Sequence, residues 1–140
     1  MFENAKKKKS LLRKKSRQTS ANVLKSFQYA FHGLIYCFKS SRNFRIHIFS
    51  ALFAFIVSLI LNINLNDFLI IIATIFSVLI LELINTSIES LVDLIVEEKF
   101  DRLAKVAKDC SAAAVLLASI NSIFVASSIF FPKIKLLLFG

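Results

Sequence analysis

Apolar positions along the chain fall into segments with different periodicities. Between residues 23 and 39, large apolar side chains recur every three to four positions, whereas Lys25, His32 and Lys39 fall on the opposite side. This spacing is typical of an amphipathic helix. A basic amphipathic helix beside a membrane span is expected to lie in the bilayer interface. We therefore predict a surface helix over about residues 23–39.

Three later segments are apolar on all sides. They cover about residues 44–63, 68–88 and 110–131, and a short polar turn separates the first two. About 20 helical residues at ~1.5 Å each cross ~30 Å of hydrocarbon. Pro132 follows the third segment and is expected to end its helix. The predicted fold is all-α and integral to the membrane, with the surface helix followed by three transmembrane helices.

The composition excludes several other classes of protein. The 140 residues are 56% hydrophobic and include only 2 Gly and 1 Pro, too few for the turns of a sandwich or barrel. Two Cys do not make a disulfide scaffold, and no Cys/His cluster has the spacing of a zinc site. No glycine-rich loop of the P-loop or Rossmann type is present. Any nucleotide must therefore be held by side chains and a metal ion.

Charge is concentrated at the N-terminus. The net charge is +9, and residues 1–45 hold 12 of the 18 basic residues but one acid, Glu3. We predict a disordered basic tail over residues 1–20 and a single membrane domain over residues 21–140. Basic residues flank spans on the cytoplasmic side, so the N-terminus and the segment 85–111 are expected in the cytoplasm of a multi-pass protein. The tail suits anionic lipid better than nucleic acid, and we expect no nucleic-acid partner.

Chemistry concentrates where the second span ends. If that helix continues, a rotation of ~100° per residue places four polar side chains within about 80° of one another. An ionisable residue at membrane depth is costly and usually functional. Clustered carboxylates can supply a general base and a magnesium ligand. The alternative is an interhelical hydrogen bond followed by a solvated extension, but the charges recur on one face without cationic partners. This set, called the polar stripe below, comprises Glu82, Asn85, Glu89 and Asp93.

Two smaller clusters lie at other predicted span ends. Lys108 precedes the third span, where a lysine usually serves to set the orientation of the chain in the membrane. If it lies opposite the polar stripe, it could instead contact phosphate, and Asp109 could hold it in place. Asn43, Arg45 and His47 begin the first span, where interfacial anchoring and a phosphate role both remain open.

The order of these blocks resembles the prokaryotic diacylglycerol kinase family, which includes the undecaprenol kinases. The matching blocks are Phe27-x-Tyr29-Ala30-x-x-Gly33-Leu34, Asn43-x-Arg45-Ile46-His47, Glu82-x-x-Asn85-Thr-x-Ile-Glu89-x-x-x-Asp93, and Ala107-Lys108-Asp109 followed by Ala113-Ala114-Val115-Leu116. The resemblance covers about residues 24–134. It implies a homotrimer in the bacterial inner membrane that transfers the γ-phosphoryl group of MgATP to a lipid hydroxyl, with sites shared between subunits.

The same resemblance implies roles for individual residues. Glu82 matches the general base, Glu89 matches a carboxylate that binds the magnesium ion of MgATP, and Asn85 supports the site. Tyr29, Lys108 and Asp109 match nucleotide contacts, while Asp93, Asn43 and Arg45 are assigned supporting positions.

One position departs from the family pattern. The family carries a second metal-binding Glu shortly before the Asn-x-Arg block, and this chain has Ser41 there. A serine hydroxyl is a weak, uncharged ligand for Mg²⁺. Despite this departure, the resemblance implies an ATP- and magnesium-dependent diacylglycerol kinase. Undecaprenol kinase of the same family is one alternative, and a non-catalytic small membrane protein, such as a holin-like oligomer, is the other.

Overall fold

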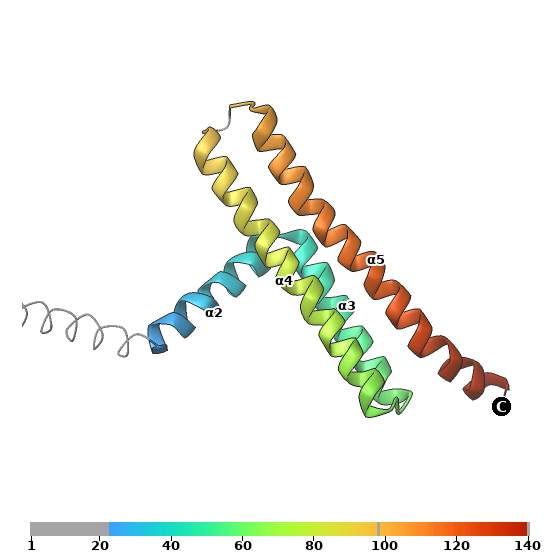
Figure 1. Ribbon diagram of the computed structural model, residues 1–140. Coiled ribbons are helices and arrows are strands. Elements are labelled where there is room, and N and C mark those ends of the chain that lie inside the picture. Colours follow the sequence, from blue (N-terminus) through green and yellow to red (C-terminus); the bar gives the residue numbers. More distant parts are fainter. Residues whose placement is uncertain (1–22, 98, 140) are drawn as a thin grey trace, which may run out of the picture. The chain divides into compact units, whose positions relative to one another are not determined.

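The computed structural model describes residues 23–97 and 99–139, and within them every regular element is an α-helix. The helices are α2 (Val23–Ser40), α3 (Arg42–Ile60), α4 (Leu65–Val96) and α5 (Arg102–Phe139) (Figure 1). Helices α3, α4 and α5 are long and apolar enough to cross a membrane. The prediction of an all-α fold with three candidate membrane spans is confirmed. The predicted basic tail lies outside the described residues.

The chain divides into two structural units, one ending at Tyr36 and the other beginning at Cys37. The described part of the first unit is the greater part of α2. Its large apolar side chains are exposed, including those of Phe27 and Phe31. Among the described residues of this unit, the apolar face of the helix is therefore exposed.

The second unit is organised around α4, which packs against α5 and against α3. Helices α4 and α5 run antiparallel (Figure 1). The buried apolar side chains are few, among them Phe44, Ile71, Val78 and Val115. Only 11%, 17% and 6% of the most apolar windows of α3, α4 and α5 are buried. The rest of this apolar surface requires lipid or further protein to cover it, because exposing it to water costs free energy in proportion to its area.

Polar residues set the turn between α3 and α4. Asn62 has a φ of 44°, a left-handed conformation that Asn adopts more readily than most residues. Asn64 is the N-cap of α4: its Oδ1 accepts from the backbone N–H of Asp67 at 2.9 Å, and its Nδ2 donates to Oδ2 of Asp67 at 2.7 Å. These bonds satisfy a backbone donor that the first turn of a helix leaves free.

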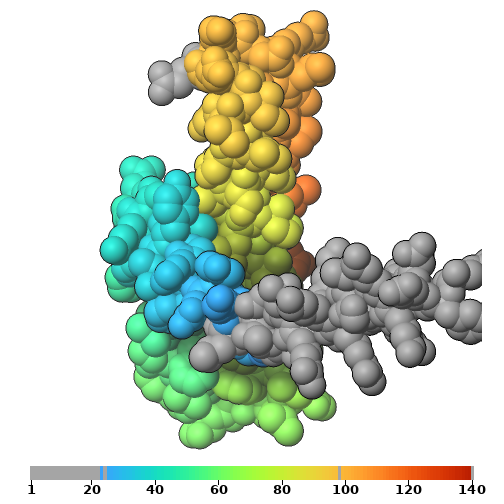
Figure 2. Space-filling model, turned by 90° about the vertical axis from the view of Figure 1, so that its left-hand side faces the viewer, coloured from blue at the N-terminus to red at the C-terminus, as the bar shows by residue number. Residues whose placement is uncertain are grey.

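Helices α4 and α5 are longer than the predicted spans. Helix α4 continues to Val96 and α5 begins at Arg102, so most of the segment 85–111 is helical. Glu97 ends α4 in a left-handed conformation, with a φ of 47°. Asp101 precedes α5 and its Oδ1 accepts from the backbone N–H of Ala104 at 2.8 Å. The polar ends of the two helices lie side by side beyond the start of α3 (Figure 2).

The prediction that Pro132 ends the third span is wrong. Helix α5 runs through Pro132 to Phe139. Proline removes one backbone hydrogen bond and crowds the preceding turn, but membrane helices tolerate it because nearby groups satisfy the freed backbone. Four of the seven helical residues after it are leucine or isoleucine, which are compatible with continuation of the helix in an apolar setting.

Candidate active site

Helix α4 carries the polar stripe without interruption, because it is helical from Leu65 to Val96. Burial changes steadily along it. Glu82 is 1% exposed and Asn85 is 6% exposed, whereas Glu89 is half-buried and Asp93 is exposed. The stripe therefore runs from the protein interior at Glu82 to the surface at Asp93.

The Glu82 carboxylate is held at one oxygen only. The hydroxyl of Ser41 donates to Oε1 of Glu82 at 2.8 Å. Oε2 of Glu82 is buried and has no hydrogen-bond partner among the described residues, and the same is true of Oγ1 of Thr86, one helical turn away. Buried polar atoms without partners are rare in proteins because desolvation is costly. These two atoms mark a place where a group outside the single chain is expected to bind.

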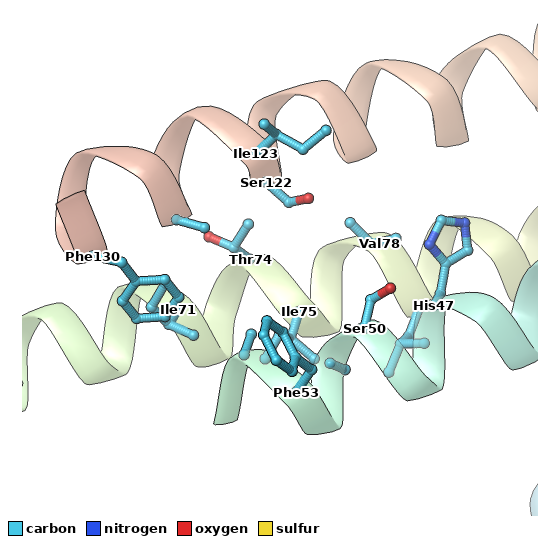
Figure 3. A pocket seen from close by; sticks show the side chains of 14 residues that line it. His47, Ser50, Phe53, Ile71, Thr74, Ile75, Val78, Ser122, Ile123 and Phe130 are labelled. Atoms are coloured by element: carbon cyan, nitrogen blue, oxygen red, sulfur yellow. The ribbon is translucent and has the colours of Figure 1, made fainter. Parts of the chain in front are cut away.

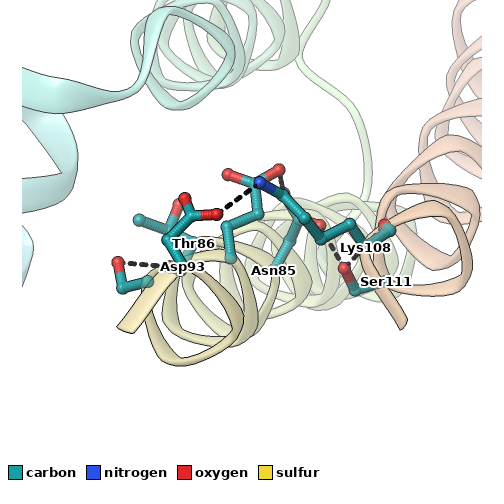
Figure 4. A network of polar contacts seen from close by, with 7 residues as sticks. Asn85, Thr86, Asp93, Lys108 and Ser111 are labelled. Carbon is teal, nitrogen blue, oxygen red and sulfur yellow. Dashed lines mark hydrogen bonds and ion pairs between the residues drawn. The ribbon is translucent and has the colours of Figure 1, made fainter. Parts of the chain in front are cut away.

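Asn85 links Glu89 to helix α5. Its Nδ2 donates to Oε1 of Glu89 at 3.1 Å, and its Oδ1 accepts from the hydroxyl of Ser111 at 2.7 Å (Figure 4). The Ser111 hydroxyl also contacts the backbone carbonyl of Lys108 at 2.9 Å. Ser111 was not among the site residues singled out from the sequence, so sequence reasoning missed this contact. The available signal was a hydroxyl one turn after Lys108, at the start of an alanine run.

Lys108 pairs with Asp93, not with Asp109 as the sequence reasoning expected. Nζ of Lys108 lies 2.9 Å from Oδ1 of Asp93, and both side chains are partly exposed (Figure 4). The polar stripe thus has a cationic partner at its surface end, which corrects the premise that it has none. Asp109 is exposed. An exposed ion pair adds little to stability, so its main effect is to hold the ammonium group beside the stripe.

A pocket lies next to the stripe on its membrane side. Helices α3, α4 and α5 line a volume of about 320 Å³, and most of the lining side chains are apolar. Val78 lines it one helical turn before Glu82, and His47 of α3 and Phe130 of α5 lie at opposite ends (Figure 3). Such a lining suits a hydrocarbon chain better than a polar ligand.

Comparison with known proteins identifies the family. Residues 28–130 match the sequence profile of the prokaryotic diacylglycerol kinases. The chain belongs to this family. It is similar to the diacylglycerol kinase of Synechocystis sp., with 41% identity over 126 residues, which are 90% of this chain and 72% of the relative. It is also similar to the undecaprenol kinase of Bacillus subtilis strain 168, with 36% identity over 110 residues, 79% of this chain and 89% of the relative.

These matches confirm the resemblance seen in the sequence and identify the chain as a multi-pass lipid kinase of this membrane family. They leave both acceptor lipids open, because each of the two relatives is named for a different one.

The other residues that the family resemblance singled out, Arg45, Asn43 and Tyr29, are not part of the polar stripe. Nη1 of Arg45 donates to the backbone carbonyls of Phe38 at 3.1 Å and Lys39 at 3.0 Å. Arg45 therefore satisfies carbonyls at the end of α2, a common task for a cation near a helix C-terminus. Asn43 is exposed, and Tyr29 is exposed on α2 in the first unit. Within the described part of the second unit, no hydrogen bond joins the side chain of Asn43 or Arg45 to the stripe.

The donor atoms of the site fit a magnesium ion that arrives with a nucleotide. The described residues contain no cluster of three or more His, Cys, Asp or Glu that could hold a metal by itself. Mg²⁺ prefers oxygen, retains several waters, and often uses one or two carboxylates together with substrate phosphates. The half-buried carboxylate of Glu89 supplies such an oxygen. Ser41 adds no charge to this site, and its hydroxyl hydrogen points to Glu82.

Proposed function

We propose that this protein transfers the γ-phosphoryl group of ATP to the hydroxyl of diacylglycerol. The observation that carries the proposal is the Glu82 carboxylate, which is 1% exposed and has one buried oxygen without a hydrogen-bond partner among the described residues. A carboxylate in this state is suited to accept a proton from a substrate hydroxyl placed against it. Its position next to an apolar pocket supports a lipid as the owner of that hydroxyl.

Glu82 is assigned the role of general base. Its Oε2 takes the proton as the O–H bond of the acceptor breaks, and the acceptor oxygen forms a bond to the γ-phosphorus. The bond between that phosphorus and the bridging oxygen of ADP breaks, and ADP leaves with the electron pair. Phosphoryl transfer depends mainly on the positioning of the reactants and on neutralisation of the phosphate charge. One oriented base and a few charged groups are therefore sufficient for catalysis.

The surface end of the stripe is assigned to the nucleotide. Glu89, oriented by Asn85, would hold the magnesium ion that accompanies ATP. That ion supplies neutralisation of the charge on the phosphates. Lys108 offers an ammonium group for phosphate, and Asp93 keeps it in place. Asp109 and Tyr29 remain assigned to the nucleotide by family resemblance alone.

Diacylglycerol is favoured over undecaprenol by the extent of similarity. The relative named as a diacylglycerol kinase matches more of this chain and at higher identity than the relative named as an undecaprenol kinase. Undecaprenol is the second candidate, because both lipids present a hydroxyl at the membrane surface and the apolar pocket accepts hydrocarbon of either kind.

Orientation and assembly follow from charge and exposure. The excess of basic residues before α3 favours a cytoplasmic N-terminus in a bacterial inner membrane, which places the ends of α4 and α5 beside cytoplasmic ATP. A homotrimer is proposed because the apolar helices are largely uncovered in one chain and the unpaired atoms of Glu82 and Thr86 need partners. This assembly would place groups of a neighbouring subunit against the stripe.

The test is a phosphoryl-transfer assay on purified protein in mixed micelles, with labelled ATP and each lipid in turn. We expect label in phosphatidic acid when diacylglycerol is supplied and less label with undecaprenol. A higher kcat/KM for undecaprenol would reassign the acceptor. Absence of transfer to both lipids by correctly folded protein would refute the kinase proposal.

A further inference from the structure

We propose that Ser41 is a positioning residue that orients the Glu82 carboxylate for proton abstraction. This inference deepens the proposed function and rests on Glu82 acting as the base. The Ser41 hydroxyl donates to Oε1 of Glu82 at 2.8 Å, while Oε2 of the same carboxylate has no partner among the described residues. One oxygen is thereby fixed, and the other is presented to the acceptor.

Two further hydrogen bonds hold Ser41 itself in place. Its backbone N–H donates to the carbonyl of Cys37 at 2.9 Å, at the end of α2. It is the N-cap of α3, with a φ of −93° and a ψ of 120°, and its Oγ accepts from the backbone N–H of Phe44 at 3.1 Å. The hydroxyl oxygen cannot move without breaking the cap, so its hydrogen has one favourable direction, towards Glu82.

The contact acts on a side chain that would otherwise be poorly restrained. A glutamate has three side-chain torsions, and fixing them costs rotamer entropy. A general base must lie within hydrogen-bond reach of the proton that it takes, and loss of alignment reduces the rate steeply. A hydrogen bond to Oε1 reduces this freedom before the substrate binds.

The helix that Ser41 caps adds an electrostatic effect. The first turn of α3 contains no acidic residue, and its N-terminal end carries a partial positive charge. Ser41 places the Glu82 carboxylate at that end. This partial positive charge attracts the carboxylate and helps to hold it in position. No negative charge on Ser41 competes for the same space.

The hydrogen-bond pattern separates this role from metal binding. The Ser41 hydroxyl uses its hydrogen for Glu82 and one lone pair for Phe44 N–H, so its oxygen is largely committed. The family pattern has a metal-binding Glu at this position. In this chain, the residue there therefore orients the general base instead of binding the metal. Removing the hydroxyl is expected to change turnover and not the magnesium requirement.

Three variants test the role. Ser41→Gly removes the hydroxyl at little cost to the cap, because glycine is a tolerated N-cap residue, whereas Ser41→Ala removes both. Ser41→Thr retains a hydroxyl and an N-cap side chain. Ser58→Ala is the matched control, since Ser58 is a buried serine of the same helix whose hydroxyl donates to the carbonyl of Ala54.

We expect kcat to fall about 10-fold in Ser41→Gly and Ser41→Ala, with unchanged KM for ATP and an unchanged magnesium concentration for half-maximal rate. Ser41→Thr should recover most of the lost turnover. Thermal unfolding in detergent should show a loss of stability in Ser41→Ala that is larger than in Ser41→Gly, and this difference separates the cap from the catalytic effect.

A double-mutant cycle provides a readout that a merely structural role would not move. If Ser41 acts through Glu82, adding Ser41→Gly to Glu82→Gln should cause less loss than the same change in the wild type. Additive losses would overturn the proposal, as would wild-type kcat in Ser41→Gly. A raised magnesium requirement at normal kcat would instead identify Ser41 as a metal ligand. An inactive wild-type protein would defeat the kinase proposal itself, which is a separate outcome.

Discussion

The hydroxyl of Ser111 on α5 and the side-chain carbonyl of Asn85 on α4 are joined by a hydrogen bond of 2.7 Å, and both side chains are buried. Because Asn85 also donates to Glu89, this one contact ties the orientation of a site carboxylate to the packing of the two helices. The polar ends of α4 and α5 thus form one hydrogen-bonded network, which holds Glu89 through Asn85.

Ser111→Ala is expected to weaken both the fold and the site. The change leaves the buried Oδ1 of Asn85 without this donor. A buried acceptor that loses its donor typically lowers the free energy of unfolding by about 1–3 kcal/mol. Glu89 loses part of its support, so the magnesium concentration for half-maximal activity should rise. Denaturation in detergent and a magnesium titration measure the two effects. Ser128→Ala is the control, because Ser128 is exposed on the same helix and donates only to the carbonyl of Phe124.

The polar stripe was predictable from the sequence because helical rotation alone places its four residues on one face. Its partners were not predictable. The bond from Ser41 to Glu82 spans 41 positions and depends on how α3 packs against α4. The pair of Lys108 with Asp93 depends on how α4 packs against α5. The persistence of α5 past Pro132 likewise depends on the environment of the helix, not on local propensity.

Glu82→Gln is expected to fold normally and to lose at least about 10²-fold in kcat, as loss of a general base usually does. Glutamine has the same size and its side-chain carbonyl can still accept from Ser41, so the helix contact should survive. Glu97→Gln is the matched control, since Glu97 is exposed at the end of α4. Near-normal turnover by Glu82→Gln would remove this residue from the role of base.

Lys108→Gln is expected to raise the KM for ATP by roughly tenfold, a typical loss for one charged phosphate contact. Stability should change little, because the ion pair with Asp93 is partly exposed. Asp93→Asn breaks the ion pair but keeps the ammonium group of Lys108, so its effect on the KM for ATP should be smaller. Steady-state kinetics at varied ATP concentration test both variants. An unchanged KM in Lys108→Gln would show that the lysine only supports helix packing.

Purified protein is expected to be a homotrimer, and Asn121 is expected to contribute to its interface. Asn121 lies near the middle of α5 and is exposed on the single chain, where an amide facing hydrocarbon would be unfavourable. Hydrogen bonds of this kind between membrane helices contribute about 0.6–2 kcal/mol. Asn121→Leu should therefore lower the trimer fraction measured by light scattering and cross-linking at low protein-to-detergent ratios. A monodisperse, fully active monomer of the wild type would contradict the trimeric assembly.

Ser41→Glu separates the two functions that can be considered for position 41. A carboxylate there restores the family's acidic residue and adds a negative charge to a site where Glu89 is the proposed ligand, so less magnesium should be needed for half-maximal rate. The same change removes the hydroxyl that orients Glu82 and brings a second negative charge beside a buried carboxylate, which is unfavourable. Turnover at saturating magnesium should therefore fall, by about as much as in Ser41→Gly. Ser41→Gln is the matched control: it has the same length without the charge, so any difference in magnesium requirement between the two variants comes from the carboxylate. Magnesium titrations at fixed ATP give both quantities. If Ser41→Glu instead turns over faster than the wild type at every magnesium concentration, the hydrogen bond from Ser41 to Glu82 does not assist the base, and position 41 belongs to the metal.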